Sequence, residues 1–168
     1  SKVINMSIPK IETKSKEEII KFQESKLPNI LGYLNSNSNF YRRLFDDNSI
    51  NVNTIKTLGD LTRIPVTTKN DLQKHNHDFL CVEKDKVIDY ITTSGTLGEP
   101  VIFAMTNGDL ERLAYNEYIS FLCADTTKED IYQLLVTLDK RFMAGMAYFM
   151  GLRKLGAGII RTGPGLQK

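Results

Sequence analysis

Thr92-Thr93-Ser94-Gly95-Thr96-Leu97-Gly98-Glu99-Pro100 lies near the middle of this 168-residue chain, between two apolar runs at residues 87–91 and 101–105. Each run is short, rich in β-branched and aromatic residues and bounded by turn residues, so together they predict a β-hairpin. The connecting loop holds four hydroxyl side chains and two glycines. Glycine allows positive φ angles and close backbone approach, so such a loop can direct several N–H and O–H groups at one anion. The stretch therefore predicts a phosphate-binding loop.

The same composition is also that of an ordinary hairpin turn, because Ser, Thr, Gly and Pro are common turn residues. The stretch is not a Walker loop, since G-x-x-x-x-G-K-[ST] is absent. It is not a dinucleotide-binding fingerprint either, since no G-x-G-x-x-G opens a helix here. From the residues alone, a phosphate loop and a plain hairpin are the two interpretations.

The composition is that of a folded domain without a strongly charged surface. Hydrophobic residues make up 41% and charged residues 25% of the chain, and the net charge is +2, which argues against a disordered chain. No basic stripe is present, so neither nucleic acid nor a membrane is an expected partner. Two widely spaced cysteines and two histidines without a nearby third ligand give no reason to expect a metal site. Free thiols and a polar N-terminal segment favour a cytoplasmic location.

The first two thirds of the chain predict helices around the hairpin. Residues 1–16 are polar and predict an N-terminal arm. Apolar spacing over residues 17–34 predicts helix, with Pro28 beginning a second helix because proline is favoured in a first turn. Residues 40–45 predict a short helical turn whose aromatic side chains enter a core. Two pairs with capping-box spacing predict further helix starts, the second of a helix reaching about residue 123: Thr68 with Asp71, and Thr106 with Asp109.

The last third predicts a β-α-β unit. A strand candidate at residues 131–138 is followed by an apolar helix at 143–155, a glycine turn and a short buried strand at 159–160. Two parallel strands joined by a crossover helix give an α/β fold, with ligands expected outside the carboxyl ends of the strands. Two loops follow these ends, and their cations could meet an anion or simply be solvated: Asp139-Lys140-Arg141 and Arg161-Thr162-Gly163-Pro164-Gly165.

The chain stops eight residues after Ile160. Both faces of a parallel sheet need cover, so we expect the sheet to be incomplete in this chain.

Four stretches together resemble a known family. Tyr90 to Pro100 resembles the phosphate-binding signature of adenylate-forming enzymes, and the most similar branch is the phenylacetate–coenzyme A ligase-like group. Three further stretches are similar to segments of that branch, in the same order: Asn39-Phe40-Tyr41-Arg42-Arg43-Leu44-Phe45, Ile64-Pro65-Val66-Thr67-Thr68-Lys69-Asn70-Asp71-Leu72 and Leu152-Arg153-Lys154-Leu155-Gly156-Ala157. The resemblance covers about residues 26 to 160.

The chain departs from the family pattern in two ways. Leu97 and Glu99 stand where the family usually has Thr and Lys, which removes a hydroxyl and replaces a cation with an anion. No later Y-G-x-T-E-like segment is present, nor a small C-terminal domain with its lysine. The resemblance thus implies that residues 17–168 are a partial N-terminal, AMP-binding domain, following the arm of residues 1–16.

By the resemblance, the parent protein is an ATP-dependent carboxylate–CoA ligase that forms an acyl-adenylate and then a thioester. ATP, Mg²⁺ and coenzyme A are the implied cofactors, and a small carboxylate is the substrate. Homodimers are common in such a group, so a homodimer is also an expectation. The residues implied to hold phosphate are Thr93, Ser94, Gly95, Thr96 and Gly98; no catalytic residue is assigned.

The chain alone is expected to be inactive, because the ribose ligand and the adenylation lysine are missing. Two alternatives stay open. One is a non-catalytic anion-binding or assembly module. The other is an adenylate-forming transferase that does not use coenzyme A.

Overall fold

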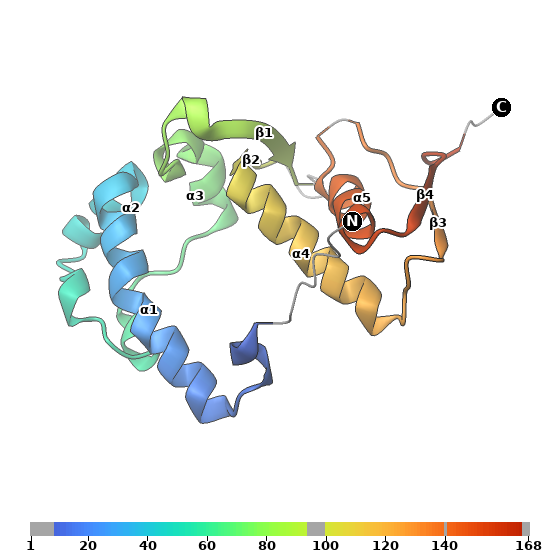
Figure 1. The fold of residues 1–168 in the computed structure, drawn as a ribbon. Coiled ribbons are helices and arrows are strands. Elements are labelled where there is room, and N and C mark those ends of the chain that lie inside the picture. The colour runs from blue at the N-terminus through green and yellow to red at the C-terminus, as the bar shows by residue number, and fades with distance from the viewer. Residues whose placement is uncertain (1–8, 94–99, 140, 166–168) are drawn as a thin grey trace. The chain divides into compact units, whose positions relative to one another are not determined.

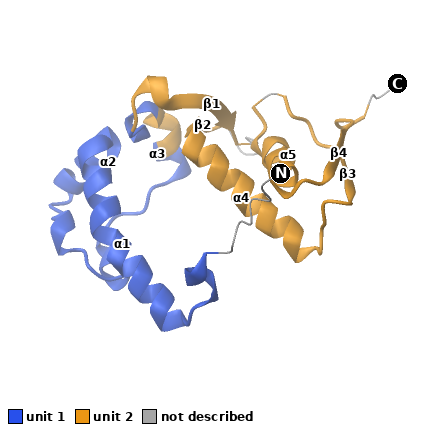
Figure 2. Ribbon diagram, in the orientation of Figure 1, with its two compact units in different colours: residues 1–71, 77–81 blue, residues 72–76, 82–168 orange. Residues whose placement is uncertain are grey.

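The computed structural model describes residues 9–93, 100–139 and 141–165 (Figure 1). The chain divides into two compact units (Figure 2): residues 1–71 with 77–81, and residues 72–76 with 82–168. Each unit has its own hydrophobic core. Mixed helices and small sheets make this an α/β structure, as the sequence predicts.

The first unit is helical. Its elements are η1 (Lys10–Thr13), α1 (Lys16–Asn37), α2 (Asn39–Asp47), η2 (Val52–Thr54) and η3 (Gly59–Arg63). Helix α1 begins with a capping box, because the Ser15 side chain accepts from the Glu18 N–H and the Glu18 side chain accepts from the Ser15 N–H. Such reciprocal bonds satisfy donors that the helix itself leaves unpaired. The buried residues of its core are Leu27, Leu31, Phe45 and Ile55.

Pro28 does not begin a second helix, and this prediction was wrong. Helix α1 passes through Pro28 without a break in its assignment. A proline inside a helix removes one backbone hydrogen bond and costs about 3 kcal/mol. Leu27 and Leu31 lie on either side of it and are only 7% and 5% exposed. Burial of two leucines stabilises by about 3–6 kcal/mol, so packing of α1 outweighs the cost of the proline.

Ser38 separates α1 from α2. It ends α1 and caps α2, where its hydroxyl oxygen accepts from the Tyr41 N–H at 3.2 Å. The same hydroxyl donates to the Asp78 carbonyl at 2.9 Å, and the residue is 1% exposed. The aromatic residues of α2 enter the core as predicted, since Phe45 is 1% exposed and Phe40 stacks on Phe79 with ring centroids 4.0 Å apart.

The second unit contains the predicted hairpin. Strand β1 (Val87–Thr92) pairs antiparallel with β2 (Ile102–Thr106), with Ile91 opposite Phe103 and Thr92 opposite Ile102. Helix α4 (Asn107–Cys123) follows at once, and Thr106 with Asp109 forms the predicted capping box. Thr68 and Asp71 make the equivalent bonds at the start of α3 (Lys69–Lys74). Both predicted helix starts are confirmed.

The predicted β-α-β unit is also present, but its last strand is not buried as predicted, because Ile160 is 52% exposed. Strands β3 (Ile131–Leu134) and β4 (Gly158–Arg161) pair in parallel, joined by α5 (Met143–Leu155). Strand β3 is shorter than the predicted 131–138, because its ladder with β4 ends at Leu134. The core beneath the sheet is formed by Leu134, Leu152 and Ala157.

Helix α5 lies directly against α4 (Figure 1). A Cβ atom placed on Gly151 would lie 2.4 Å from the Cβ of Glu117, so the two helices touch where α5 has no side chain. This contact explains why α5 has a glycine at position 151. Gly156 ends the helix at φ 93°, a left-handed conformation that favours glycine. Within the described residues, no helix combines the length and apolarity needed to cross a bilayer.

Candidate functional site

The candidate site starts from the loop root, which we define as Thr92, Thr93 and Val101. The Thr93 N–H donates to the Val101 carbonyl, and the Val101 N–H donates to the Thr93 hydroxyl oxygen, both at 3.1 Å. Val101 is 2% exposed, which anchors this end in the protein. Thr93 and Val101 are therefore held side by side.

The Thr93 hydroxyl can still donate a hydrogen bond to a ligand. A threonine hydroxyl has one donor and two acceptor positions, and the bond from Val101 uses an acceptor. The residue is exposed, so its O–H hydrogen can still donate to an anion. The other predicted phosphate ligands lie outside the described residues: Ser94, Gly95, Thr96 and Gly98.

A second segment meets the loop root. The Thr92 N–H donates to the carbonyl of Arg141 at 2.9 Å, and Thr92 forms an isolated parallel bridge with Phe142. The turn that follows β3 therefore ends against the last residue of β1. The sequence did not predict this contact, because a turn of polar residues gives no signal of what it will pair with.

The turn carrying Arg141 is also hydrogen-bonded within itself. The Phe142 N–H donates to the Asp139 carbonyl at 3.2 Å, and the Thr137 hydroxyl donates to the Asp139 carboxylate. Arg141 itself has φ 60°. Its left-handed conformation is uncommon for a residue with a Cβ, so the surrounding bonds hold it there.

The other predicted anion loop is occupied by its own bonds. The N–H groups of Thr162 and Gly163 both donate to the Leu134 carbonyl at 3.2 Å. The Arg161 guanidinium lies over the Phe149 ring, 5.5 Å from its centroid. These two amides are therefore bonded within the protein and are not directed at a ligand. Of the remaining predicted cations, Arg141 lies at the loop root and Lys140 is outside the described residues.

The carboxyl group of Asp109, in the capping box of α4, has a lowered pKa. Partial burial would raise the pKa of Asp109, but the N–H and hydroxyl of Thr106 and the nearby Arg112 outweigh burial and lower it. Asp109 is thus a helix cap held in its charged form. Among residues 9–93, 100–139 and 141–165 no group of three or more His, Cys, Asp or Glu side chains could hold a metal ion.

Comparison with known proteins extends this picture. No family model matches the chain. It is 34% identical over 107 residues to the phenylacetate-coenzyme A ligase of Thermus thermophilus, covering 63% of this chain and 24% of that protein. It is 28% identical over 159 residues to the phenylacetate-coenzyme A ligase of Escherichia coli, covering 94% of this chain and 36% of that protein.

Solved structures share the fold. A crystal structure of 2-hydroxyisobutyryl-CoA ligase in complex with 2-HIB-AMP and CoA matches 95% of this chain and 35% of its own, with a TM-score of 0.85 and 23% identity. An open conformation of that enzyme matches with a TM-score of 0.83.

The fold is therefore that of part of an adenylate-forming ligase. Within that class, the chain resembles the phenylacetate–coenzyme A ligase-like branch that its motifs predict, consistent with an N-terminal portion. The chain spans about a quarter to a third of the length of the curated relatives it matches.

Proposed function

We propose that this chain is part of an ATP-dependent acyl- or aryl-CoA ligase and contributes the polyphosphate-binding loop of its adenylation site. The observation that carries the proposal is the loop root. Two reciprocal hydrogen bonds join Thr93 and Val101 on either side of a Ser-, Thr- and Gly-rich stretch, and none of the described residues accepts a hydrogen bond from the Thr93 O–H. Preorganised donors of this kind stabilise charge without reorganising during the reaction.

In the proposed reaction, a carboxylate oxygen attacks the α-phosphorus of ATP and pyrophosphate leaves. The thiolate of coenzyme A then attacks the acyl carbon, a thioester forms and AMP leaves. Thr93 and the 94–98 loop bind and orient the polyphosphate. In phosphoryl and nucleotidyl transfer, alignment of the reacting groups supplies much of the rate enhancement. Mg²⁺ would enter with the nucleotide and neutralise phosphate charge.

The loop is tested by calorimetric titration of Mg-ATP into the 168-residue chain and into a Ser94→Ala plus Thr96→Ala variant. We expect millimolar or tighter binding that weakens at least tenfold in the variant, because two donors are lost. A matched control removes two hydroxyls that bond only to helix carbonyls, Ser25→Ala plus Ser120→Ala, and should bind as the wild type. Equal binding by all three proteins would contradict the phosphate-loop assignment.

We expect the chain alone not to turn over substrate, since it spans only 24% and 36% of the length of these two relatives. Pyrophosphate release is measured with Mg-ATP, coenzyme A and a panel of aryl and alkyl carboxylates. Carboxylate-dependent release would contradict the expected inactivity. Product formation that does not depend on coenzyme A would favour an adenylate-forming transferase of another kind.

An assembly module is the second candidate, because one face of the β3–β4 sheet is apolar and exposed. Tyr132 and Leu134 face the core, whereas Ile131 and Ile160 lie on the other face and are 71% and 52% exposed. Patches of this kind mark interaction surfaces. If the chain self-associates through this face, Ile131→Lys plus Ile160→Lys should lower the molar mass measured by light scattering. A wild type that is monomeric at all concentrations would remove the support for this candidate.

A further inference from the structure

The charge of the phosphate loop does not match its proposed ligand. Residues 93–99 contain no Lys or Arg, and Glu99 adds a negative charge. A polyphosphate carries several negative charges, and arginine recognises phosphate through paired, charge-assisted hydrogen bonds. If the loop binds a polyphosphate, which is the proposed function on which this inference rests, Mg²⁺ would neutralise part of the phosphate charge, and a cation from elsewhere in the chain would add charge-assisted hydrogen bonds that the loop itself does not supply.

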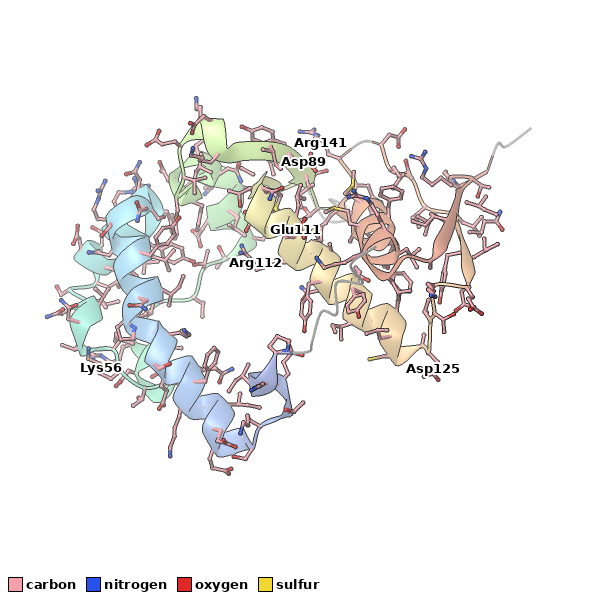
Figure 3. All side chains as sticks on the ribbon, in the orientation of Figure 1. Lys56, Asp89, Glu111, Arg112, Asp125 and Arg141 are labelled. Atoms are coloured by element: carbon pink, nitrogen blue, oxygen red, sulfur yellow. The ribbon has the colours of Figure 1, made fainter. Side chains whose placement is uncertain are left out.

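Arg141 is in the right place to supply that cation. Its carbonyl accepts from the Thr92 N–H at 2.9 Å, so its Cα lies next to the residue that precedes Thr93. The bridge between Thr92 and Phe142 keeps the two segments aligned. Figure 3 labels Arg141 beside the end of β1. The long arginine side chain therefore starts at the loop root.

The backbone of Arg141 is held in an uncommon conformation. Its φ of 60° is left-handed, and the N–H of the next residue, Phe142, is bonded back to the Asp139 carbonyl. Strained conformations of this kind persist where the surrounding structure over-determines them, and they cluster at functional sites. A glycine would fit here without strain, so the arginine is not required by the turn.

Among the residues that the structure describes, no carboxylate neutralises the guanidinium charge of Arg141. The side chain is exposed. Asp139, two residues earlier, bonds with Thr137 instead. Arg43 and Arg112, by contrast, form ion pairs with Asp78 and Asp109. The positive charge of Arg141 is thus available to a ligand at the loop root.

We propose that Arg141 is a ligand-binding residue that supplies, from the turn after β3, the positive charge that the 93–99 loop lacks, and that it contacts the phosphate groups of a nucleoside triphosphate or of pyrophosphate. The Thr93 O–H and the Arg141 guanidinium would then bind the same polyanion from two segments that one backbone hydrogen bond holds together.

The test is calorimetric titration of Mg-pyrophosphate and of Mg-ATP into the 168-residue chain, at 50 and 300 mM salt. Arg141→Gly removes the charge and suits φ 60°, so it should fold as well as the wild type and bind both ligands about tenfold or more weakly. Arg141→Lys keeps the charge and should restore part of the affinity. Arg153→Ala removes an equivalent exposed charge at the opposite end of α5 and should bind as the wild type.

Salt dependence separates a charge contact from a structural role. Loss of a real ionic contact makes binding less sensitive to salt, whereas a change in fold would not. A flatter salt dependence in Arg141→Gly supports the proposal. Binding by Arg141→Gly that equals the wild type at both salt concentrations would overturn it, while the proposed function would stand. If the wild type binds neither ligand, the proposed function and this inference both fail.

Discussion

The α4–α5 contact at Gly151 gives a quantitative prediction. In Gly151→Ala the new Cβ would lie 2.4 Å from the Cβ of Glu117 and 3.0 Å from the backbone N of Tyr118. Ordinary contacts lie at 3.4 Å or more, so α5 must move away from α4 by about 1 Å at this position. Overpacking costs about 1–3 kcal/mol. Because the contacted atoms are a Cβ and backbone atoms, which cannot rotate away, we expect the upper part of that range, about 2–3 kcal/mol, partly offset by about 1 kcal/mol from replacing a helical glycine with alanine.

We therefore expect Gly151→Ala to lower the free energy of unfolding by about 1–2 kcal/mol. For a chain of this length that corresponds to a fall in Tm of about 2–8 °C, measured by calorimetry or by circular dichroism. Gly108→Ala is the matched control in α4, because its nearest neighbours would be 3.7 Å away. Its Tm should stay the same or rise. A Gly151→Ala protein as stable as the wild type would refute the close packing of the two helices.

Three further substitutions test other parts of the fold. Ser38→Ala removes the α2 cap and leaves buried groups without their partner, so it should cost about 1–3 kcal/mol in urea unfolding. Pro28→Ala should stabilise the chain by about 1–3 kcal/mol, since α1 is continuous there; a loss of stability would mean that the proline has a packing role. Because the pKa of Asp109 is lowered below its ordinary 3.8, its charge contributes stability above about pH 4 that is lost as the pH falls through the folded pKa. Asp109→Asn should thus be less stable than the wild type at pH 7, and the difference in Tm should narrow towards pH 3; a constant difference would contradict this.

Local features of the fold were predictable because short-range physics determines them. The capping pair Thr106 and Asp109 is three residues apart, and the two strands of the hairpin follow one another in the sequence. Pro28 was mispredicted because its local preference was overridden by the burial of Leu27 and Leu31, which depends on tertiary packing. The sequence predicted a crossover helix that needs to be covered, but it did not predict that α4 would pack against it.

The candidate site was predictable only in part, for a related reason. The loop composition pointed to phosphate, and three cations were candidates to meet it. The bonds that distinguish Arg141 from Arg161 join residues far apart in the sequence. Spacing carries no information about such contacts, so only the structure could separate the two arginines.

The hydrogen bond between Thr92 and Arg141 also has a consequence for how the loop acquires its shape. The two residues are 49 positions apart, and closing a chain segment of that length costs about 3 kcal/mol in entropy, beyond a constant contribution. Folding of α4 and β3 must meet this cost before the loop root is complete. A peptide containing only the hairpin would therefore lack the hydrogen bond from Thr92 to Arg141 that completes the loop root. A ligand that binds the loop should stabilise the whole β-α-β unit against unfolding, in proportion to its affinity and concentration.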